Sequence, residues 1–256
     1  MSQRSVKAAI VPFEKLKDDA LYAAILSYPR PQKAELRKRL KELQMLGVTA
    51  LEFSGDKHVF DVSVLGKGCV GIVLIAYVDK VKAALKVRRL DAGRTEMRHE
   101  AEMLEKANCV NVGPRLLGYT DNMLLMQFVD GSLLPQWLQA HSGKLRTRRV
   151  LHEILMQCWL LDGISLDHGE LSHGPKHVIV DRADRPFIVD FETASIHRTP
   201  ANLTSICHYL FIGGIAAEVA TRIGQRDKKS MVHALRAYKK VRNRESFEEI
   251  LEACAL

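Results

Sequence analysis

The chain has 256 residues, of which 47% are hydrophobic and 27% charged, and its formal net charge is +8. This composition is typical of a folded protein with a sizeable core and excludes a disordered chain. The sequence begins without an apolar leader, and its longest apolar stretches, at residues 70–78 and 209–217, are too short to span a bilayer. We therefore expect a cytoplasmic protein with no membrane partner.

The first 60 residues predict two helices and a β-hairpin. Apolar residues recur at helical spacing over residues 21–28 and 34–46, and prolines separate the two runs. Residues 50–53 and 59–65 alternate like strands around a Ser-Gly-Asp turn. This order fits a winged-helix unit that holds a nucleic acid, and it fits equally well an extension packed on the domain that follows.

Residues 61–130 predict a β-rich lobe with one helix. Three strands are expected over residues 62–87, a helix over residues 95–107, and a further strand pair at residues 116–119 and 123–129.

Residues 131–256 predict a lobe that is mainly helical. Gly131 ends the preceding strand, a helix follows at residues 133–140, and helices dominate from residue 148 onwards. Two short apolar strands, at residues 178–180 and 187–189, interrupt them. We therefore expect an α+β protein with an N-terminal extension (1–60) and two lobes.

Residues 66–73 read Gly-Lys-Gly-Cys-Val-Gly-Ile-Val, and Lys86 follows in an apolar stretch. Glycines let backbone amides approach phosphate oxygens closely, and a lysine on a nearby strand adds a positive charge for the same phosphates. A dinucleotide-binding turn has a similar pattern but opens a helix, whereas the residues that follow here are β-branched. The pattern favours an ATP-binding loop; the alternative is a plain hairpin with glycines at positive φ.

A carboxylate on the following helix should pair with Lys86 and direct it. Glu100 is the candidate because it shares a helix face with the apolar Leu104, four residues later. Glu96 lies one turn earlier on the same face and is the competitor. The alternative is that either glutamate pairs only with Arg98 or with solvent.

Two carboxylates of the second lobe suit phosphoryl transfer. Glu170 lies in the triplet His-Gly-Glu, and Asp190 follows an apolar strand in the triplet Asp-Phe-Glu. One carboxylate can take or orient the proton of the acceptor hydroxyl, while the other holds the metal that bridges the phosphates. Alternatively, Asp190 only caps a helix that begins near residue 193.

From about Val62 to Ser195 the chain resembles the protein-kinase-like superfamily, in particular the atypical archaeal relatives of the RIO kinases and of the small kinase of the KEOPS complex. The resemblance implies a two-lobed kinase fold with ATP and Mg²⁺ as cofactors. It places Glu170 at the position of the catalytic aspartate and Asp190 at that of the metal-binding aspartate. Glu192 replaces the hinge glycine of the family's Asp-Phe-Gly, so switching by that hinge is not expected.

The family's metal-binding asparagine has no direct counterpart. It should lie five residues after Glu170, where Pro175 stands. A two-residue insertion would place His177 there, although histidine suits Mg²⁺ poorly and could instead contact a phosphate or water. Ser172 or Glu192 could then supply a metal oxygen.

The resemblance also implies an adenine site at the junction of the lobes. Backbone groups at Gln127 and Val129 would meet the adenine edge, and Leu65 and Val73 would cover the ring. An interior strand followed by a turn would look the same. The expected nucleotide-binding residues are Gly66, Lys67, Gly68, Gly71, Val73, Lys86, Gln127 and Val129.

The acceptor is less clearly indicated. The sequence after Asp190 has little room for the activation loop on which protein kinases bind peptides, and the chain carries several basic clusters. We expect structured RNA, such as a tRNA ribose 2′-hydroxyl, slightly ahead of protein serine or threonine. The alternatives are an ATP-binding pseudokinase that acts as a scaffold and a nucleic-acid-binding protein that uses residues 1–60. The oligomeric state stays open.

Overall fold

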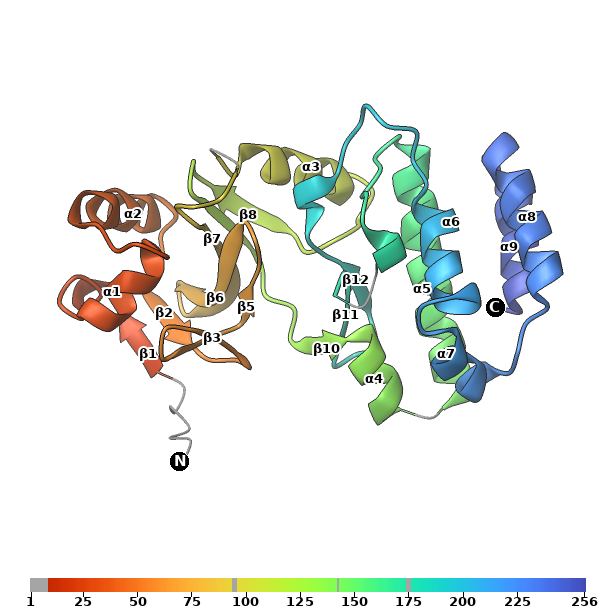
Figure 1. The fold of residues 1–256 in the computed structure, drawn as a ribbon, viewed down its shortest axis with the longest axis horizontal. Coiled ribbons are helices and arrows are strands. Elements are labelled where there is room, and N and C mark those ends of the chain that lie inside the picture. Colours follow the sequence, from red (N-terminus) through yellow and green to blue (C-terminus); the bar gives the residue numbers. More distant parts are fainter. Residues whose placement is uncertain (1–8, 94–95, 142, 174–175) are drawn as a thin grey trace. The chain divides into compact units, whose positions relative to one another are not determined.

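The computed structural model describes residues 9–93, 96–141, 143–173 and 176–256. The chain divides into two compact units (Figure 1). The first runs up to Glu102 and includes Arg115–Phe128; the second comprises Met103–Pro114 and Val129–Leu256. The predicted α+β class is confirmed, with an antiparallel sheet in the first unit and mainly helices in the second.

A seven-stranded antiparallel sheet forms the framework of the first unit. Its strands are β1 (Ala9–Pro12), β2 (Ala50–Phe53), β5 (Gly66–Lys67), β6 (Gly71–Val78), β7 (Val81–Arg88), β8 (Leu116–Tyr119) and β9 (Met123–Gln127). Their order is β1-β2-β6-β7-β9-β8, and β5 pairs with β6. The central strands β6 and β7 are mostly buried, as their apolar sequences require.

Both N-terminal helices are present and pack on this sheet (Figure 1). After the short 3₁₀ turn η1 (Phe13–Lys15), α1 spans Ala20–Leu26 and α2 spans Lys33–Met45. Asp19 caps α1 by accepting hydrogen bonds from two backbone amides of its first turn. Apolar residues of α1 and α2 share one buried cluster with β2.

The predicted hairpin between residues 50–53 and 59–65 is wrong. β2 pairs with β1 and β6, while β3 (Lys57–Val59) and β4 (Val62–Val64) pair only with each other. The chain reverses at Phe60, which has a φ of 51°. Most of β2 is buried, which suits an interior strand. Residues 9–60 therefore extend the sheet of the first unit and do not form a separate winged-helix unit.

A buried polar network fastens α2 to the ends of the strands. Arg39 is fully buried; it donates to the carbonyl of Arg88 at 2.6 Å and to Glu35 at 2.8 Å. Asn122 donates to Glu42 at 2.7 Å and accepts two hydrogen bonds from the Arg88 guanidinium. Buried polar groups are stable only with partners, so this network specifies how α2 docks.

The second unit is built mainly from helices. They are α4 (Leu134–Ala140), α5 (Lys144–Gly163), α6 (Asn202–Cys207), the π-helical turn η4 (His208–Ile212), α7 (Ala216–Ile223), α8 (Lys228–Lys240) and α9 (Arg244–Cys254). A small antiparallel sheet contains β10 (Gly131–Leu133), β11 (Val178–Asp181) and β12 (Pro186–Ile188). The 3₁₀ turns η2 (Leu171–His173) and η3 (Phe191–Thr193) flank β11 and β12.

Several predicted boundaries change. The helix expected at residues 95–107 is α3 (Arg98–Asn108); Thr95 lies outside the described residues. The predicted helix from residue 202 divides into α6 and η4. Gly131, predicted to end the preceding strand, is the first residue of β10. A Cβ there would overlap the carbonyl oxygen of Val180 on the paired strand, which explains the glycine.

The described helices were also compared with the dimensions of a bilayer. None of them alone has the length and hydropathy to cross it, and the one pair that reaches these values together, Asn202–Ile212 with Ala216–Ile223, is bent by 72°.

Removal of residues 1–60 should unfold the first unit. It would strip β1 and β2 from the sheet, leave β6 as an open edge, and expose the apolar surface that Leu43, Leu51 and Phe53 cover. We expect circular dichroism to show no cooperative thermal transition for this unit. A control that lacks only residues 1–8 should unfold like the full chain. Cooperative unfolding of the longer truncation at the full-length midpoint would show instead that residues 1–60 are dispensable.

Candidate functional site

The glycine-rich residues form a tight hairpin between β5 and β6. The amide of Gly68 donates to the carbonyl of Gly71 across the turn at 2.8 Å. Gly66, Gly68 and Gly71 all lack a positive φ, so the expectation of glycines at positive φ is wrong, while the ATP-binding role of the hairpin stays a prediction. The amides of Cys69 and Val70 at the tip donate to no group among the described residues. Unpaired amides in a turn are the groups with which a protein binds anions.

Gly71 makes room for Lys86. A Cβ at Gly71 would lie 2.9 Å from Cγ of Lys86 and 3.2 Å from the carbonyl oxygen of Val87, both closer than ordinary contacts. A Cβ at Gly68 would meet only a carbonyl oxygen, at 3.7 Å. The lysine side chain therefore passes directly over the third glycine of the motif.

Lys86 forms the predicted pair with Glu100. Nζ of Lys86 lies 2.9 Å from Oε1 and 2.8 Å from Oε2 of Glu100. The two residues are 6% and 4% exposed. Glu96, the competitor, instead lies 3.7 Å from the exposed Arg98. The predicted partner Glu100 is confirmed, and Glu96 lies before α3 begins. The pair is buried deeply enough for its electrostatic energy to be large.

Arg89, which the sequence did not single out, holds the hairpin tip. Nη1 of Arg89 donates to the carbonyl of Gly68, and the backbone amide of Arg89 donates to the carbonyl of Val70, both at 2.8 Å. The Arg89 guanidinium pairs with Asp91 and lies 5.1 Å from the ring centre of Tyr28. Arg89 thus occupies two tip carbonyls and leaves the tip amides without internal partners.

The other expected nucleotide-binding residues lie as follows. Lys67 is exposed, with its ammonium 5.0 Å from the ring centre of Tyr28. Val73 is half-buried and accepts a hydrogen bond from the amide of Leu65. The amide of Gln127 donates to the carbonyl of Arg115 at 2.8 Å, so the amide does not meet an adenine edge, and the role of the other backbone groups of Gln127 stays a prediction. Val129 begins the second unit, and its role stays a prediction.

In the second unit, backbone hydrogen bonds hold residues 168–170. Asp167 and Ser195 exchange two backbone hydrogen bonds, of 2.9 and 2.8 Å. The hydroxyl of Thr193 donates to the carbonyl of residue 168 at 3.0 Å. Gly169 has a φ of 90°, where other residues are strained, and this explains the glycine between the histidine and the glutamate.

This arrangement brings Glu170, His177 and Asp190 together. One potential ligand atom from each lies within 4.8 Å of the others, and Nε2 of His177 is 3.2 Å from Oε2 of Glu170. Asp190 is left-handed, with a φ of 70°, and its side chain makes no capping hydrogen bond, so the predicted capping role is wrong. Pro175, on which the predicted insertion depends, lies outside the described residues.

The hydrogen bonds of His177 decide what it can do. Burial lowers the pKa of His177, so the ring is neutral at neutral pH. Nδ1 is buried without a hydrogen-bond partner among the described residues, whereas Nε2 reaches Glu170. A proton on Nδ1 would be buried unpaired, so we assign it to Nε2. His177 then orients Glu170 by a hydrogen bond, and this geometry does not favour the expected role as a metal ligand.

Carboxylates remain as possible ligands for Mg²⁺. Asp190 and Glu170 belong to the cluster just described, and an oxygen of Glu192 also lies within 4.8 Å of one of Asp190. Mg²⁺ is commonly held by one or two carboxylates and keeps several waters or phosphate oxygens. The oxygen donors therefore fit Mg²⁺, with Asp190 at their centre.

A buried network supports the segment that carries Glu170. The side chain of Asn202 accepts a hydrogen bond of 2.8 Å from the amide of His168. It donates hydrogen bonds to the carbonyl of Leu166 at 2.6 Å and to Asp162 at 2.9 Å. Nε2 of His168 bonds the carbonyl of Val189 at 3.0 Å, and burial lowers the pKa of His168 to about 4, which keeps it neutral. Sequence reasoning missed Asp162 and Asn202 because no local pattern links them to residue 168.

No protein-family model matches the chain, and no match is found among curated proteins. The kinase resemblance therefore depends on the motifs and on the local geometry described above.

The contact between Gly71 and Lys86 predicts that Gly71→Ala destabilises the protein. The added methyl group would displace Lys86 from a crowded site, and we expect the free energy of unfolding to fall by about 1–3 kcal/mol. Gly68→Ala is the matched control and should change it by less than about 1 kcal/mol, because its methyl group has space. Urea denaturation measures both. Equal effects would mean that Gly71 has no special packing role.

The buried pair predicts strong coupling between Lys86 and Glu100. Lys86→Met or Glu100→Leu alone leaves one buried charge unpaired and should lower the free energy of unfolding by about 3–5 kcal/mol. The double variant should recover most of this loss, because it leaves no buried charge. Glu96→Ala, at an exposed pair, should change stability by less than about 1 kcal/mol. Additive losses in the double variant would contradict the pairing.

Proposed function

We propose that the protein is an ATP-dependent phosphotransferase that passes the γ-phosphate to a hydroxyl group of a macromolecule. The buried Lys86–Glu100 pair beneath the glycine hairpin carries this proposal. A purely structural core site is usually served as well or better by apolar residues, so an ion pair in this place favours a role for the ammonium group. The unpaired tip amides supply a second set of groups that suit phosphate oxygens.

The second unit supplies the remaining chemistry in this proposal. Glu170 accepts or orients the proton of the attacking hydroxyl, and His177 holds the Glu170 carboxylate in position. Asp190, with Glu192 or Glu170, would hold Mg²⁺. When bound, Mg²⁺ neutralises part of the charge on the phosphates.

For the acceptor, we propose structured RNA, such as a tRNA ribose 2′-hydroxyl, ahead of protein serine or threonine. Only residues 194–201 separate η3 from α6, which leaves little chain to form a platform for an extended peptide. The net charge of +8 also suits a polyanionic acceptor better than a neutral peptide.

A specific observation supports a second candidate, an ATP-binding pseudokinase that acts as a scaffold. His177 stands where the resemblance expects a metal-binding asparagine, and its hydrogen bonds favour contact with Glu170 over metal binding. Such a protein would bind ATP without transferring phosphate.

A transfer assay tests the first proposal. The purified protein is incubated with γ-labelled ATP and MgCl₂, together with either total tRNA or a protein acceptor pool. We expect label in the tRNA pool, and a loss of at least about 100-fold with Lys86→Ala and with Asp190→Ala, because each removes a group that handles the phosphates or the metal. Glu96→Gln, at an exposed carboxylate just before α3 that pairs only with Arg98 among the described residues, should retain activity.

Label confined to the protein pool would identify a protein kinase. Tight ATP binding with no label in either pool would favour the scaffold. Equal labelling by the wild type and Asp190→Ala would contradict the assignment of Asp190.

A further inference from the structure

The positive charge of the chain is concentrated around one helix. Residues 226–244 contain eight of the 38 Lys and Arg residues and one of the 30 Asp and Glu residues. The rest of the chain is nearly balanced, with 30 basic and 29 acidic residues. This segment consists of α8 and its two flanks.

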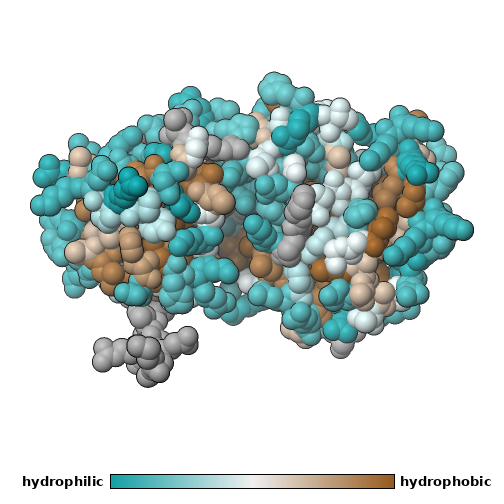
Figure 2. Space-filling model, in the orientation of Figure 1, coloured by the Kyte–Doolittle hydropathy of each residue, from teal (hydrophilic) through white to brown (hydrophobic). Residues whose placement is uncertain are grey.

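The basic side chains cover the exposed side of α8. Its buried side consists of Met231, Ala234, Leu235 and Tyr238. The exposed residues at the opposite helical positions are Lys229, His233, Arg236 and Lys240, flanked by Lys228 and Lys239; we call these six residues the basic face. Figure 2 shows a hydrophilic surface at the end of the second unit where Figure 1 places α8.

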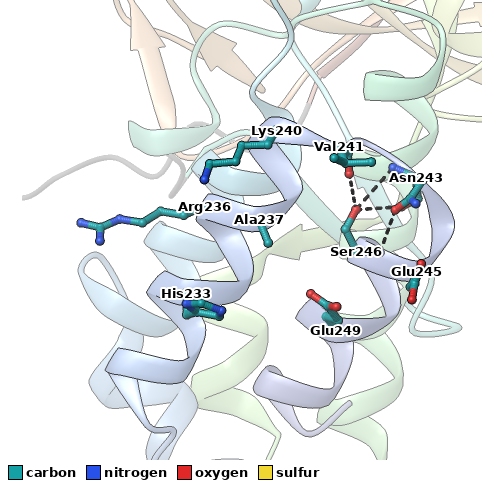
Figure 3. Close-up of a pocket in the computed structure, with 9 residues that line it drawn as sticks. All are labelled: His233, Arg236, Ala237, Lys240, Val241, Asn243, Glu245, Ser246 and Glu249. Carbon is teal, nitrogen blue, oxygen red and sulfur yellow. Dashed lines mark hydrogen bonds between the residues drawn. The ribbon is translucent and has the colours of Figure 1, made fainter.

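No carboxylate neutralises the basic face. Within the described part of the chain, no ion pair of 4.0 Å or less involves its lysines or Arg236. A groove of about 570 Å³ separates part of this face from Glu245 and Glu249 of α9 (Figure 3). The carboxylate of Asp227 caps the N-terminus of α8, where it accepts hydrogen bonds from the backbone amides of Lys229 and Ser230.

This distribution is unfavourable for the isolated protein. Lys228 and Lys229 lie in the first turn of α8, where the helix dipole favours negative charge. Cations along one helix face also repel each other. A cationic helix face whose lysines and arginine form no ion pair with the described residues is the pattern expected of a binding face for a polyanion.

We propose that the basic face of α8 binds the phosphate backbone of a nucleic acid. A membrane surface fits less well, because the apolar side of α8 is buried in the protein and none is left to enter a bilayer. The acidic wall formed by Glu245 and Glu249 repels phosphates and directs the backbone onto α8. Binding at this interface does not require ATP, so the proposal goes beyond the transferase activity proposed above.

Salt-dependent binding tests the interface. The affinity of the full-length protein for a fluorescein-labelled RNA duplex, and for a DNA duplex of the same sequence, is measured by anisotropy without ATP between about 50 and 200 mM KCl. The variant Lys229→Gln/Arg236→Gln/Lys240→Gln should bind at least about 10-fold more weakly and reduce the slope of log affinity against log salt by about 2–3, because three phosphate contacts are lost.

The matched control is Lys33→Gln/Arg37→Gln/Lys41→Gln, which removes three exposed cations from one face of α2. It should leave the slope unchanged, and this control also tests nucleic-acid binding by the N-terminal helices. The α8 variant should melt within a few degrees of the wild type, since Lys229→Gln removes an unfavourable charge from the first turn of α8 and Lys240→Gln removes a favourable one from the last turn. Asp190→Ala should bind the duplexes normally, which separates this interface from the transferase proposal.

Binding of both duplexes, or of RNA alone, supports the proposal. Equal slope changes in the two triple variants would overturn it, because binding would then reflect net charge only. Tighter binding of the wild type to phosphatidylserine vesicles or to polyglutamate than to either duplex would also overturn it.

Discussion

The first unit depends on the burial of one charged pair. An ammonium group removed from water is stable only beside a carboxylate, so Lys86 on β7 requires Glu100 on α3. The lysine can reach that carboxylate because Gly71 leaves space along its side chain. One ion pair thus connects the glycine hairpin, a central strand and a helix, and a change in any of them affects the other two.

In the second unit, hydrogen bonds to the backbone hold the segment that carries Glu170. The segment before Glu170 has no regular structure of its own, and Ser195 and Asn202 hold it through bonds to its backbone amides and carbonyls. Gly169 and Asp190 both adopt left-handed backbone conformations. At Asp190 this is uncommon for a residue with a side chain, and such conformations are often found at functional sites.

Much of the local structure could be predicted from residue patterns. Helical spacing located α1 and α2, and it placed Glu100 on the buried face of its helix. It also placed Glu96 on that face, and only the start of α3 at Arg98 excludes Glu96. The same spacing could not find the partners of β2, because strand pairing depends on segments distant in sequence. Arg89 and Tyr28 were missed for the same reason: Arg89 meets the hairpin tip, and Tyr28 meets Arg89, only after folding.

Residue type and period along the chain were sufficient to indicate helices, strands and the chemistry of the candidate groups Lys86, Glu100, Glu170 and Asp190, because charge and helical periodicity are local properties. Folding decided which of these groups acquire partners. In the folded protein the amide of Gln127 donates to the carbonyl of Arg115, and Nε2 of His177 is the ring nitrogen that reaches Glu170. Such outcomes depend on contacts between segments that are distant in the sequence, and these segments come together only in the tertiary structure.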